Sequence, residues 1–409
     1  MNQDVTIDPI AANDVNTQWR RFERAWAVAV LCLIAATWKL WSPSSGFPAV
    51  PMFAIPFPAI TIDFLAISML IASLVWVALA RQKTRCEFLL VLFGFGLAFI
   101  QNQHRLQPWA YQAALQSIVF AALLPRPALR WLMALSISIY FYSACGKFDY
   151  QFLHTVGQDF VSVVLGPIEG DPSRMRIALA ASLPATELAI AIGLCFARSR
   201  RMAGMAAMVM HASLIGLLGP WNLAHSLGVL LWNICLLLQA WFLYVRKPSE
   251  DPIPLPTSGF ATIAKAIITL ALIMPLFERS GYWDHWLSWS LYSPHTSRVE
   301  IEVHKSVLAS FPQSARAFVL ENEEGDAWHL FETDRWSVKS VGVPIYPQAR
   351  FQVGVARNIA KSISDADGIR IKVKSVADRW TGSRVETWWR GRNEIETAAQ
   401  DYLFLEPSR

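Results

Sequence analysis

The run TIDFLAISMLIASLVWVALA, residues 61–80, is almost free of charge and is followed at once by the basic residues Arg81, Lys83 and Arg85. The apolar core of a bilayer is about 30 Å thick, and a helix of about 20 apolar residues crosses it. Backbone groups inside lipid must be hydrogen-bonded within the segment, so a helix is expected. The run lacks the polar face, repeating every 3.6 residues, that marks a surface helix of a soluble protein. It therefore predicts an integral membrane protein.

Apolar runs of the same kind recur through the first two thirds of the chain. The 409 residues are 54% apolar and 16% charged, and the charges are scarce between Arg24 and Phe277. The predicted spans are residues 25–41, 61–80, 87–102, 110–124, 131–146, 176–196, 202–219, 226–245 and 260–277. We therefore predict a polytopic α-helical membrane protein, with a helical domain at residues 25–278 and about nine transmembrane helices.

The basic residues between these spans are distributed unequally. With the N-terminal segment 1–24 in the cytoplasm, the inner loops carry thirteen Lys and Arg residues and the outer loops carry four. The inner set is Arg20, Arg21, Arg24, Arg81, Lys83, Arg85, Arg126, Arg130, Arg198, Arg200, Arg201, Arg246 and Lys247. This asymmetry agrees with the positive-inside rule. Nine crossings then place residues 279–409, here called the tail, outside the cytoplasm.

The tail has the pattern of a small α+β domain. Residues 299–303 and 369–374 alternate between apolar and polar side chains, which is typical of half-buried strands, and residues 351–363 have one apolar helical face. We expect a sheet of about four strands. The tail has 17 basic and 17 acidic residues, so the +5 net charge of the chain lies in the helical part and does not predict a nucleic-acid partner.

No metal site or disulfide framework is predicted. The five cysteines lie in or beside apolar segments and form no CxxC motif. The four tail histidines, His285, His295, His304 and His329, show no ligand spacing. Of the loops, residues 42–60 are rich in proline and are expected to be non-helical. Residues 147–175 are expected to form one or two amphipathic helices on the outer surface.

Two ionisable residues inside the predicted spans are candidates for chemistry. Glu187 and His211 each lie twelve residues from the short loop centred near Ser199. At 1.5 Å per residue, both are about 18 Å from that loop, at the same depth. Ionisable groups in a bilayer are costly and often functional. They are expected to form either a proton-handling pair or an interhelical hydrogen bond that fixes packing.

A second candidate cluster lies at the outer ends of the spans. Lys147 is the candidate catalytic or anion-binding group, and its alternative role is an interfacial lysine paired with Asp149. Together with Glu187 and His211 it is expected to form the catalytic set. The candidate substrate- or cofactor-binding residues around an outward-open cavity are His104, Arg105, Trp109, Asp149, Asn222 and His225.

One motif resembles a known family. Ser143, Ala144, Lys147, Asp149, Phe152, Leu153 and Gly157 are followed by Pro184, Glu187, Gly193, Leu194 and then His211. This pattern, over about residues 131–245, is similar to membrane proteins of the MauE/DoxX class. The resemblance implies a protein of the bacterial inner membrane that is linked to redox maturation or to quinone-coupled oxidation. The chain departs from the class in lacking a cysteine pair.

A second resemblance is to the vitamin-K-dependent carboxylase-like (HTTM) family. It rests on the layout of a helical membrane domain, the Lys147-x-Asp149 motif, a tail rich in strands, and the segment Trp289-Ser290-Leu291-Tyr292-Ser293 after the last span. It implies a membrane enzyme that acts on a peptide or a lipid-soluble cofactor, with Lys147 as the base.

Three hypotheses follow. The first is a DoxX/MauE-like component of an extracytoplasmic redox or maturation pathway, whose tail docks a protein partner. The second is a carboxylase-like enzyme that uses a quinone-type cofactor. The third is a membrane scaffold in which Lys147, Glu187 and His211 only pack.

Overall fold

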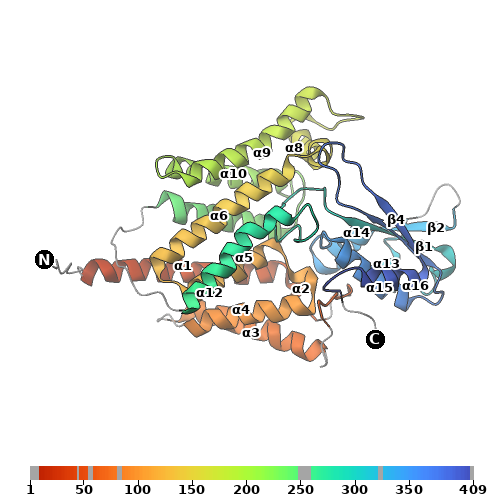
Figure 1. Cartoon of the computed structure of the whole chain (residues 1–409), viewed down its shortest axis with the longest axis horizontal. Coiled ribbons are helices and arrows are strands. Elements are labelled where there is room, and N and C mark those ends of the chain that lie inside the picture. Colours follow the sequence, from red (N-terminus) through yellow and green to blue (C-terminus); the bar gives the residue numbers. More distant parts are fainter. Residues whose placement is uncertain are drawn as a thin grey trace.

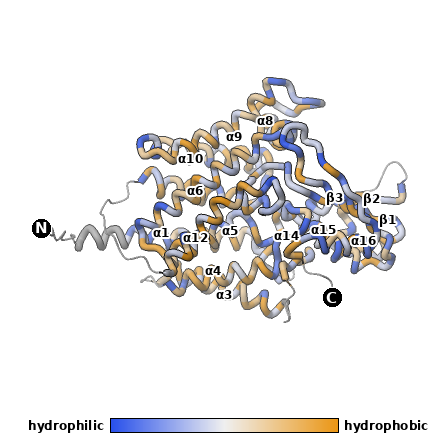
Figure 2. Tube along the Cα trace, viewed as in Figure 1, coloured by the Kyte–Doolittle hydropathy of each residue, from blue (hydrophilic) through white to orange (hydrophobic). Residues whose placement is uncertain are grey.

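The molecule is a bundle of helices with an α+β tail at one end. A computed structural model describes residues 9–43, 46–53, 59–80, 85–246, 259–320 and 326–405. Helix α1 (Pro9–Ala36) begins at the end of the bundle opposite the tail (Figure 1). Coloured by hydropathy, the bundle helices are mostly apolar, and polar residues gather in the tail and at the helix ends (Figure 2).

Each of the nine predicted spans is largely helical. The bundle helices are α1 (Pro9–Ala36) with the short α2 (Trp38–Trp41), α3 (Ala59–Leu79), α4 (Arg85–Gln101), α5 (Pro108–Ala122), α6 (Pro125–Lys147), α9 (Arg174–Cys195), α10 (Arg200–Leu218), α11 (Leu227–Ala240) continued by the π-helical turn η2 (Trp241–Val245), and α12 (Gly259–Ile273) continued by the 3₁₀ turn η3 (Met274–Phe277). Helix α1 begins at Pro9, well before the predicted start of the first span at residue 25. The polar residues that precede the apolar run therefore belong to the same helix.

Six helices in the described part of the chain are long and apolar enough to cross a membrane: residues 60–79, 125–147, 174–195, 200–218, 227–245 and 259–277. The predicted count of nine is therefore not confirmed. The reason is plain for α5, which has only 15 residues and is buried on nearly every side. A helix that is apolar all round belongs in the core of a bundle, where its neighbours and not lipid cover it.

Two loops with predicted structures, residues 42–60 and 147–175, lie partly or fully within the described residues. The 147–175 loop contains two helices, α7 (Tyr150–His154) and α8 (Val156–Leu165). No helix occurs at residues 42–43 or 46–53, and the rest of the proline-rich loop before residue 59 lies outside the described residues. The short 3₁₀ turn η1 (Gln103–Arg105) joins α4 to α5.

The tail contains one four-stranded antiparallel sheet in the order β2-β1-β3-β4. The strands are β1 (Arg298–His304), β2 (Trp328–Phe331), β3 (Ile369–Lys374) and β4 (Glu386–Arg390). Both predicted strands are present, and they pair with Val299 opposite Val373. The remaining elements are η4 (Lys305–Val307), α13 (Gln313–Arg316), α14 (Thr333–Val341), α15 (Ala349–Ser362) and α16 (Gly391–Gln400), and α15 confirms the helix predicted at 351–363.

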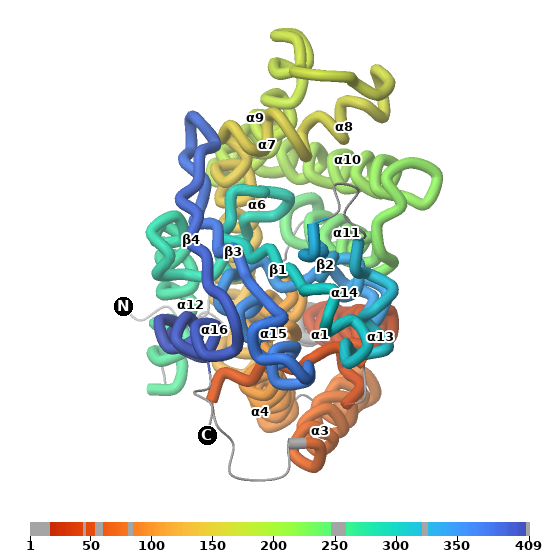
Figure 3. Tube along the Cα trace, turned by 90° about the vertical axis from the view of Figure 1, so that its right-hand side faces the viewer, coloured from red at the N-terminus to blue at the C-terminus, as the bar shows by residue number. Residues whose placement is uncertain are grey.

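The tail packs directly on one end of the bundle, as the view from that side shows (Figure 3). Arg350 of α15 donates a hydrogen bond to Gln103 of η1 over 2.7 Å, and the Gln103 amide donates one to the Phe404 carbonyl over 2.7 Å. Val50 lies so close to Gly354 of α15 that a Cβ there would be 2.6 Å from a Val50 methyl group. Apolar residues of the bundle and of the tail form one continuous core.

Candidate functional site

A buried ion pair joins α6 to α9. The Lys147 ammonium, in the last turn of α6, lies 2.5 Å from the Glu187 carboxylate of α9, and the side chains are 10% and 12% exposed. Lys147 also donates a hydrogen bond to Ser143 Oγ over 2.7 Å, one turn back on the same helix. The two partners place the ammonium between α6 and α9, where an unpaired charge would be costly.

His211 of α10 belongs to a neighbouring polar network. Its Nε2 is hydrogen-bonded to the Tyr140 hydroxyl over 3.0 Å, and its Nδ1 to the Asn233 side chain over 2.9 Å. Asn233 lies on α11 and donates its own hydrogen bond to the Val229 carbonyl. Tyr140, Ser143 and Lys147 are three and four residues apart, so all three lie on one face of α6. That face collects the polar groups of α9, α10 and α11.

Of the three predicted catalytic residues, Lys147 contacts Glu187 directly, whereas within the described part of the chain His211 is connected to them only through Tyr140 on the same face of α6. Among the described residues, no hydrogen bond joins Glu187 to His211. The equal depth of the two residues was inferred from their distance to the loop, but depth does not fix the direction in which a side chain faces. The alternative pairing of Lys147 with Asp149 is wrong, because Asp149 turns away to receive hydrogen bonds from the Phe152 amide and from Arg279.

One predicted binding residue, His104, lies at the junction of bundle and tail, where it is hydrogen-bonded to the Pro344 carbonyl over 2.8 Å. Two more contact bundle residues. Arg105 forms a bidentate ion pair with Asp63 of α3 and donates a hydrogen bond to the Leu40 carbonyl over 3.1 Å, and Trp109 packs against Trp41. None of these contacts reaches Lys147, Glu187 or His211 in the described part of the molecule.

His104 is fully enclosed at that junction. Its ring lies between Phe47 and Phe351, with ring centroids 5.4 and 5.0 Å away. Burial lowers the pKa of His104 to about 4, against the opposing effect of its bond to the Pro344 backbone and with a small contribution from Arg105. The imidazole is therefore neutral at pH 7.

Of the six predicted binding residues, Asp149 is placed above, and the last two lie in the loop between α10 and α11. Asn222 is exposed and donates a hydrogen bond to the Gly216 carbonyl over 2.9 Å. His225 is half-buried and packs edge-on against Tyr292 at 5.6 Å, and burial lowers its pKa below the ordinary value. Of these two residues, it is His225 that faces the chain covering the tail-side end of α6.

That covering chain is the connecting segment, residues 278–297, which runs from α12 to β1. A Cβ added at Gly146 would lie 2.9 Å from Ser293 Oγ and 3.2 Å from Ser290 Oγ, so the segment touches the helix one residue from Lys147. Trp289 is completely buried against Tyr111. The connecting segment therefore closes the tail-side end of the polar face of α6.

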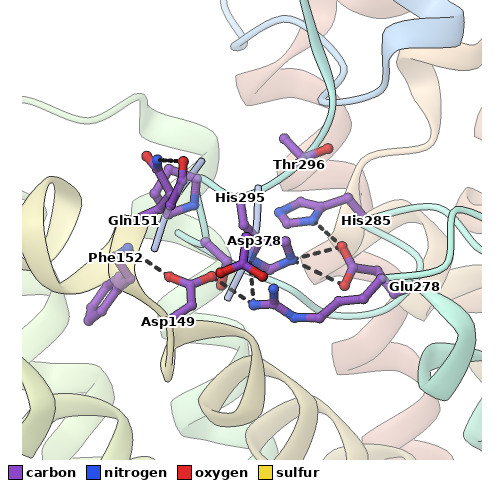
Figure 4. A network of polar contacts seen from close by, with 12 residues as sticks. Asp149, Gln151, Phe152, Glu278, His285, His295, Thr296 and Asp378 are labelled. Carbon is purple, nitrogen blue, oxygen red and sulfur yellow. Dashed lines mark hydrogen bonds and ion pairs between the residues drawn. The ribbon is translucent and has the colours of Figure 1, made fainter. Parts of the chain in front are cut away.

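The connecting segment also carries a polar cluster that the sequence did not predict. Glu278, His285 and His295 are buried, and their ligand atoms all lie within 4.8 Å of one another. Asp149 joins them through His295 (Figure 4). Burial alone would raise the pKa of Glu278, but hydrogen bonds from both histidines hold it well below its usual range. The three residues lie on irregular chain between η3 and β1 and not on one helix or strand, so no local pattern marked this cluster.

A cavity lies at the opposite end of the bundle. Its lining includes Trp19, Arg20 and Arg24 of α1, Arg85 at the start of α4 and Phe120 of α5. It does not include Lys147, Glu187 or His211. This cavity is therefore a different one from the outward-open cavity that was predicted next to Lys147, Glu187 and His211.

Comparison of the chain with family models, with curated proteins and with solved structures finds no match. The resemblances to the MauE/DoxX class and to the carboxylase-like family stay predictions.

Proposed function

We propose that this chain is a membrane enzyme in which Lys147 transfers a proton to or from a lipid-soluble, quinol-type molecule. The observation that carries the proposal is the ion pair of Lys147 with Glu187, which is held inside the helical bundle and joins two of its long apolar helices. A lysine that only anchored a helix at the membrane surface would extend toward water. This lysine instead points inward to a carboxylate.

The pair provides a simple route for a proton. In a site of low dielectric constant, an ammonium and a carboxylate 2.5 Å apart are converted into a neutral amine and a neutral acid by one proton moving between them. The amine then accepts a proton from the hydroxyl group of a bound quinol, which becomes a quinolate anion. Glu187 releases its own proton to water, so the ammonium and the carboxylate are restored. Ser143 holds the lysine nitrogen in place during this exchange. The carboxylase-like resemblance implies the same role for Lys147.

The proposal includes a location and an orientation. Six long apolar helices are compatible with a multi-pass membrane protein. The excess of basic residues in alternate loops supports a cytoplasmic N-terminus and a periplasmic tail in a bacterial inner membrane. An alkaline phosphatase reporter fused after Arg409 is expected to be active, and a green fluorescent reporter at the same position is expected to stay dark. An inactive phosphatase fusion and a fluorescent green reporter would contradict the proposed orientation.

Binding of a quinol is the direct test. The full chain, purified in detergent, is heated with and without menaquinol and ubiquinol analogues, and a rise in melting temperature is expected. Lys147→Met should abolish the rise, and Glu187→Gln should weaken it, because both variants remove the proton-exchanging pair. The matched control is Lys265→Met on α12, which changes a lysine away from the pair and should keep the full rise.

Two results would contradict the proposal. If no quinol raises the melting temperature of the unmodified chain, the ligand class is wrong. If Lys147→Met responds to the quinol as the unmodified chain does, the pair has no part in binding, and the scaffold hypothesis is favoured.

A further inference from the structure

The strongest unassigned feature is the cluster formed by Glu278, His285 and His295. Glu278 follows the η3 turn of the last membrane helix, and the two histidines lie on the connecting segment before β1. Glu278 Oε1 is 2.8 Å from His285 Nδ1 and 2.9 Å from His295 Nε2. The two imidazole rings stand edge to face with centroids 4.9 Å apart. Two ring nitrogens and one carboxylate thus face a common centre (Figure 4).

The second nitrogen of His295 is also hydrogen-bonded. His295 Nδ1 lies 2.8 Å from Asp149 Oδ2. A histidine that binds a metal through one nitrogen commonly donates its other N–H to a carboxylate or to a backbone carbonyl, which orients the ring. His295 has this arrangement.

Charged groups lie beside the two rings. The Arg279 guanidinium lies 3.3 Å from His295 Nδ1 and 2.7 Å from Asp149 Oδ2. The cluster thus combines two carboxylates, Glu278 and Asp149, with one guanidinium and two imidazole rings.

We propose that Glu278, His285 and His295 bind a divalent transition-metal ion of the zinc type. Two imidazoles and one carboxylate are a known zinc donor set, whereas Mg²⁺ and Ca²⁺ prefer oxygen ligands throughout. Ligand atoms about 2.0–2.1 Å from a tetrahedral zinc ion lie about 3.3 Å apart, and the three ligand atoms here, all within 4.8 Å of one another, need only small rotations to reach that spacing.

The surrounding chain holds the donors in place. Arg384 donates hydrogen bonds to the carbonyl groups of Pro294 and Thr296, each over 2.7 Å, and the Ala377 amide donates one to the His295 carbonyl over 2.8 Å. Trp289 and Tyr292, between the two histidines, adopt left-handed backbone conformations with φ of 58° and 59°. Such angles are unfavourable for bulky residues and persist only where the surroundings enforce them. The bound ion fixes the connecting segment between the last membrane helix and the sheet.

Metal content is the first measurement. The full chain is purified in detergent with a tag that lacks histidine, and its metals are measured by mass spectrometry. About one zinc-type ion per chain is expected, and His285→Ala and His295→Ala should lower this to near zero. His329→Ala is the matched control, since this half-buried tail histidine on β2 is outside the cluster, and it should keep the full content.

A second measurement does not depend on the folding of a variant. The unmodified chain is stripped with a chelator and reloaded with Co²⁺, whose visible absorption reports tetrahedral coordination by nitrogen and oxygen. Asp149→Asn should weaken metal affinity by about 10–100-fold, because it loses the charge that orients His295. If the unmodified chain carries no stoichiometric metal, and the stripped chain binds neither Zn²⁺ nor Co²⁺ at one ion per chain, the proposal is overturned. Neither measurement depends on the role of Lys147.

Discussion

The Lys147 ammonium lies 2.5 Å from the Glu187 carboxylate and ties the last turn of α6 to the middle of α9. The sequence named both residues as candidates but did not pair them, and it offered Asp149 as the lysine partner. Asp149 is instead part of the contacts between α7 and the connecting segment. The ion pair is the feature on which the proposed proton transfer depends.

Breaking the ion pair from one side should destabilise the protein. Glu187→Gln leaves the Lys147 charge buried without its counter-ion, which typically costs about 3 kcal/mol or more. The double variant Lys147→Met/Glu187→Gln removes both charges and should recover most of the melting temperature in detergent, but not the quinol response. A double variant that responds to quinol would contradict the proton-transfer role and leave the pair as packing.

The pair of Arg105 with Asp63 should behave as a purely structural contact. Arg105 is only 2% exposed and also satisfies the Leu40 carbonyl. Arg105→Met should lower the free energy of unfolding by about 3 kcal/mol, because it leaves the Asp63 carboxylate buried without its cationic partner. Adding Asp63→Leu should restore part of the loss, and thermal unfolding of both variants measures it. The quinol response per folded molecule should stay unchanged in both, and its loss would place Arg105 in the binding site after all.

His104 should make the protein less stable in mild acid. Its pKa of about 4 lies below the ordinary 6.5, so the folded state resists the proton that the unfolded state accepts. The part of the free energy of unfolding that comes from keeping His104 neutral is fully present above about pH 6.5. It is lost as the pH falls toward 4, and the loss reaches about 3 kcal/mol. His104→Gln cannot titrate, so its melting temperature should fall less between pH 7 and pH 4.5. Parallel curves for the two proteins would show that His104 does not control this loss.

The junction of tail and bundle should be sensitive to one methyl group. In Gly354→Ala the new Cβ would lie 2.6 Å from a Val50 methyl group and 2.9 Å from Leu405. Overpacking of this kind costs about 1–3 kcal/mol. The tail of Gly354→Ala should be cut faster by added protease, and Gly354→Ala/Val50→Ala should be cut more slowly than Gly354→Ala alone. Equal rates for all three proteins would mean that this contact does not hold the tail.

Local patterns predicted the helices and two strands well, because a membrane helix or a half-buried strand reveals itself within a few residues. The run at 61–80 became α3, and the alternation at 299–303 became β1. The strands β2 and β4 were not individually predicted. Trp328–Phe331 is only four residues long, and every side chain of Glu386–Arg390 is partly or fully exposed, so neither shows a clear alternation.

The candidate site was predicted only in part. Lys147, Glu187 and His211 could be named as candidates from the sequence because ionisable side chains are rare in apolar runs. Their partners depend on how α6 is rotated against α9 and α10, which is a property of packing. The cluster of Glu278, His285 and His295 depends on irregular backbone at Trp289 and Tyr292, for which the sequence gives no signal.

The hydrogen bond between Gln103 and Phe404 joins residues 301 positions apart in the chain. During synthesis, the loop that contains Gln103 must therefore wait until 301 further residues have left the ribosome. Closing so long a loop is entropically costly and slow. The junction of bundle and tail is thus a late step of folding, and until then the apolar residues around Val50 and Phe47 are open to chaperones and proteases.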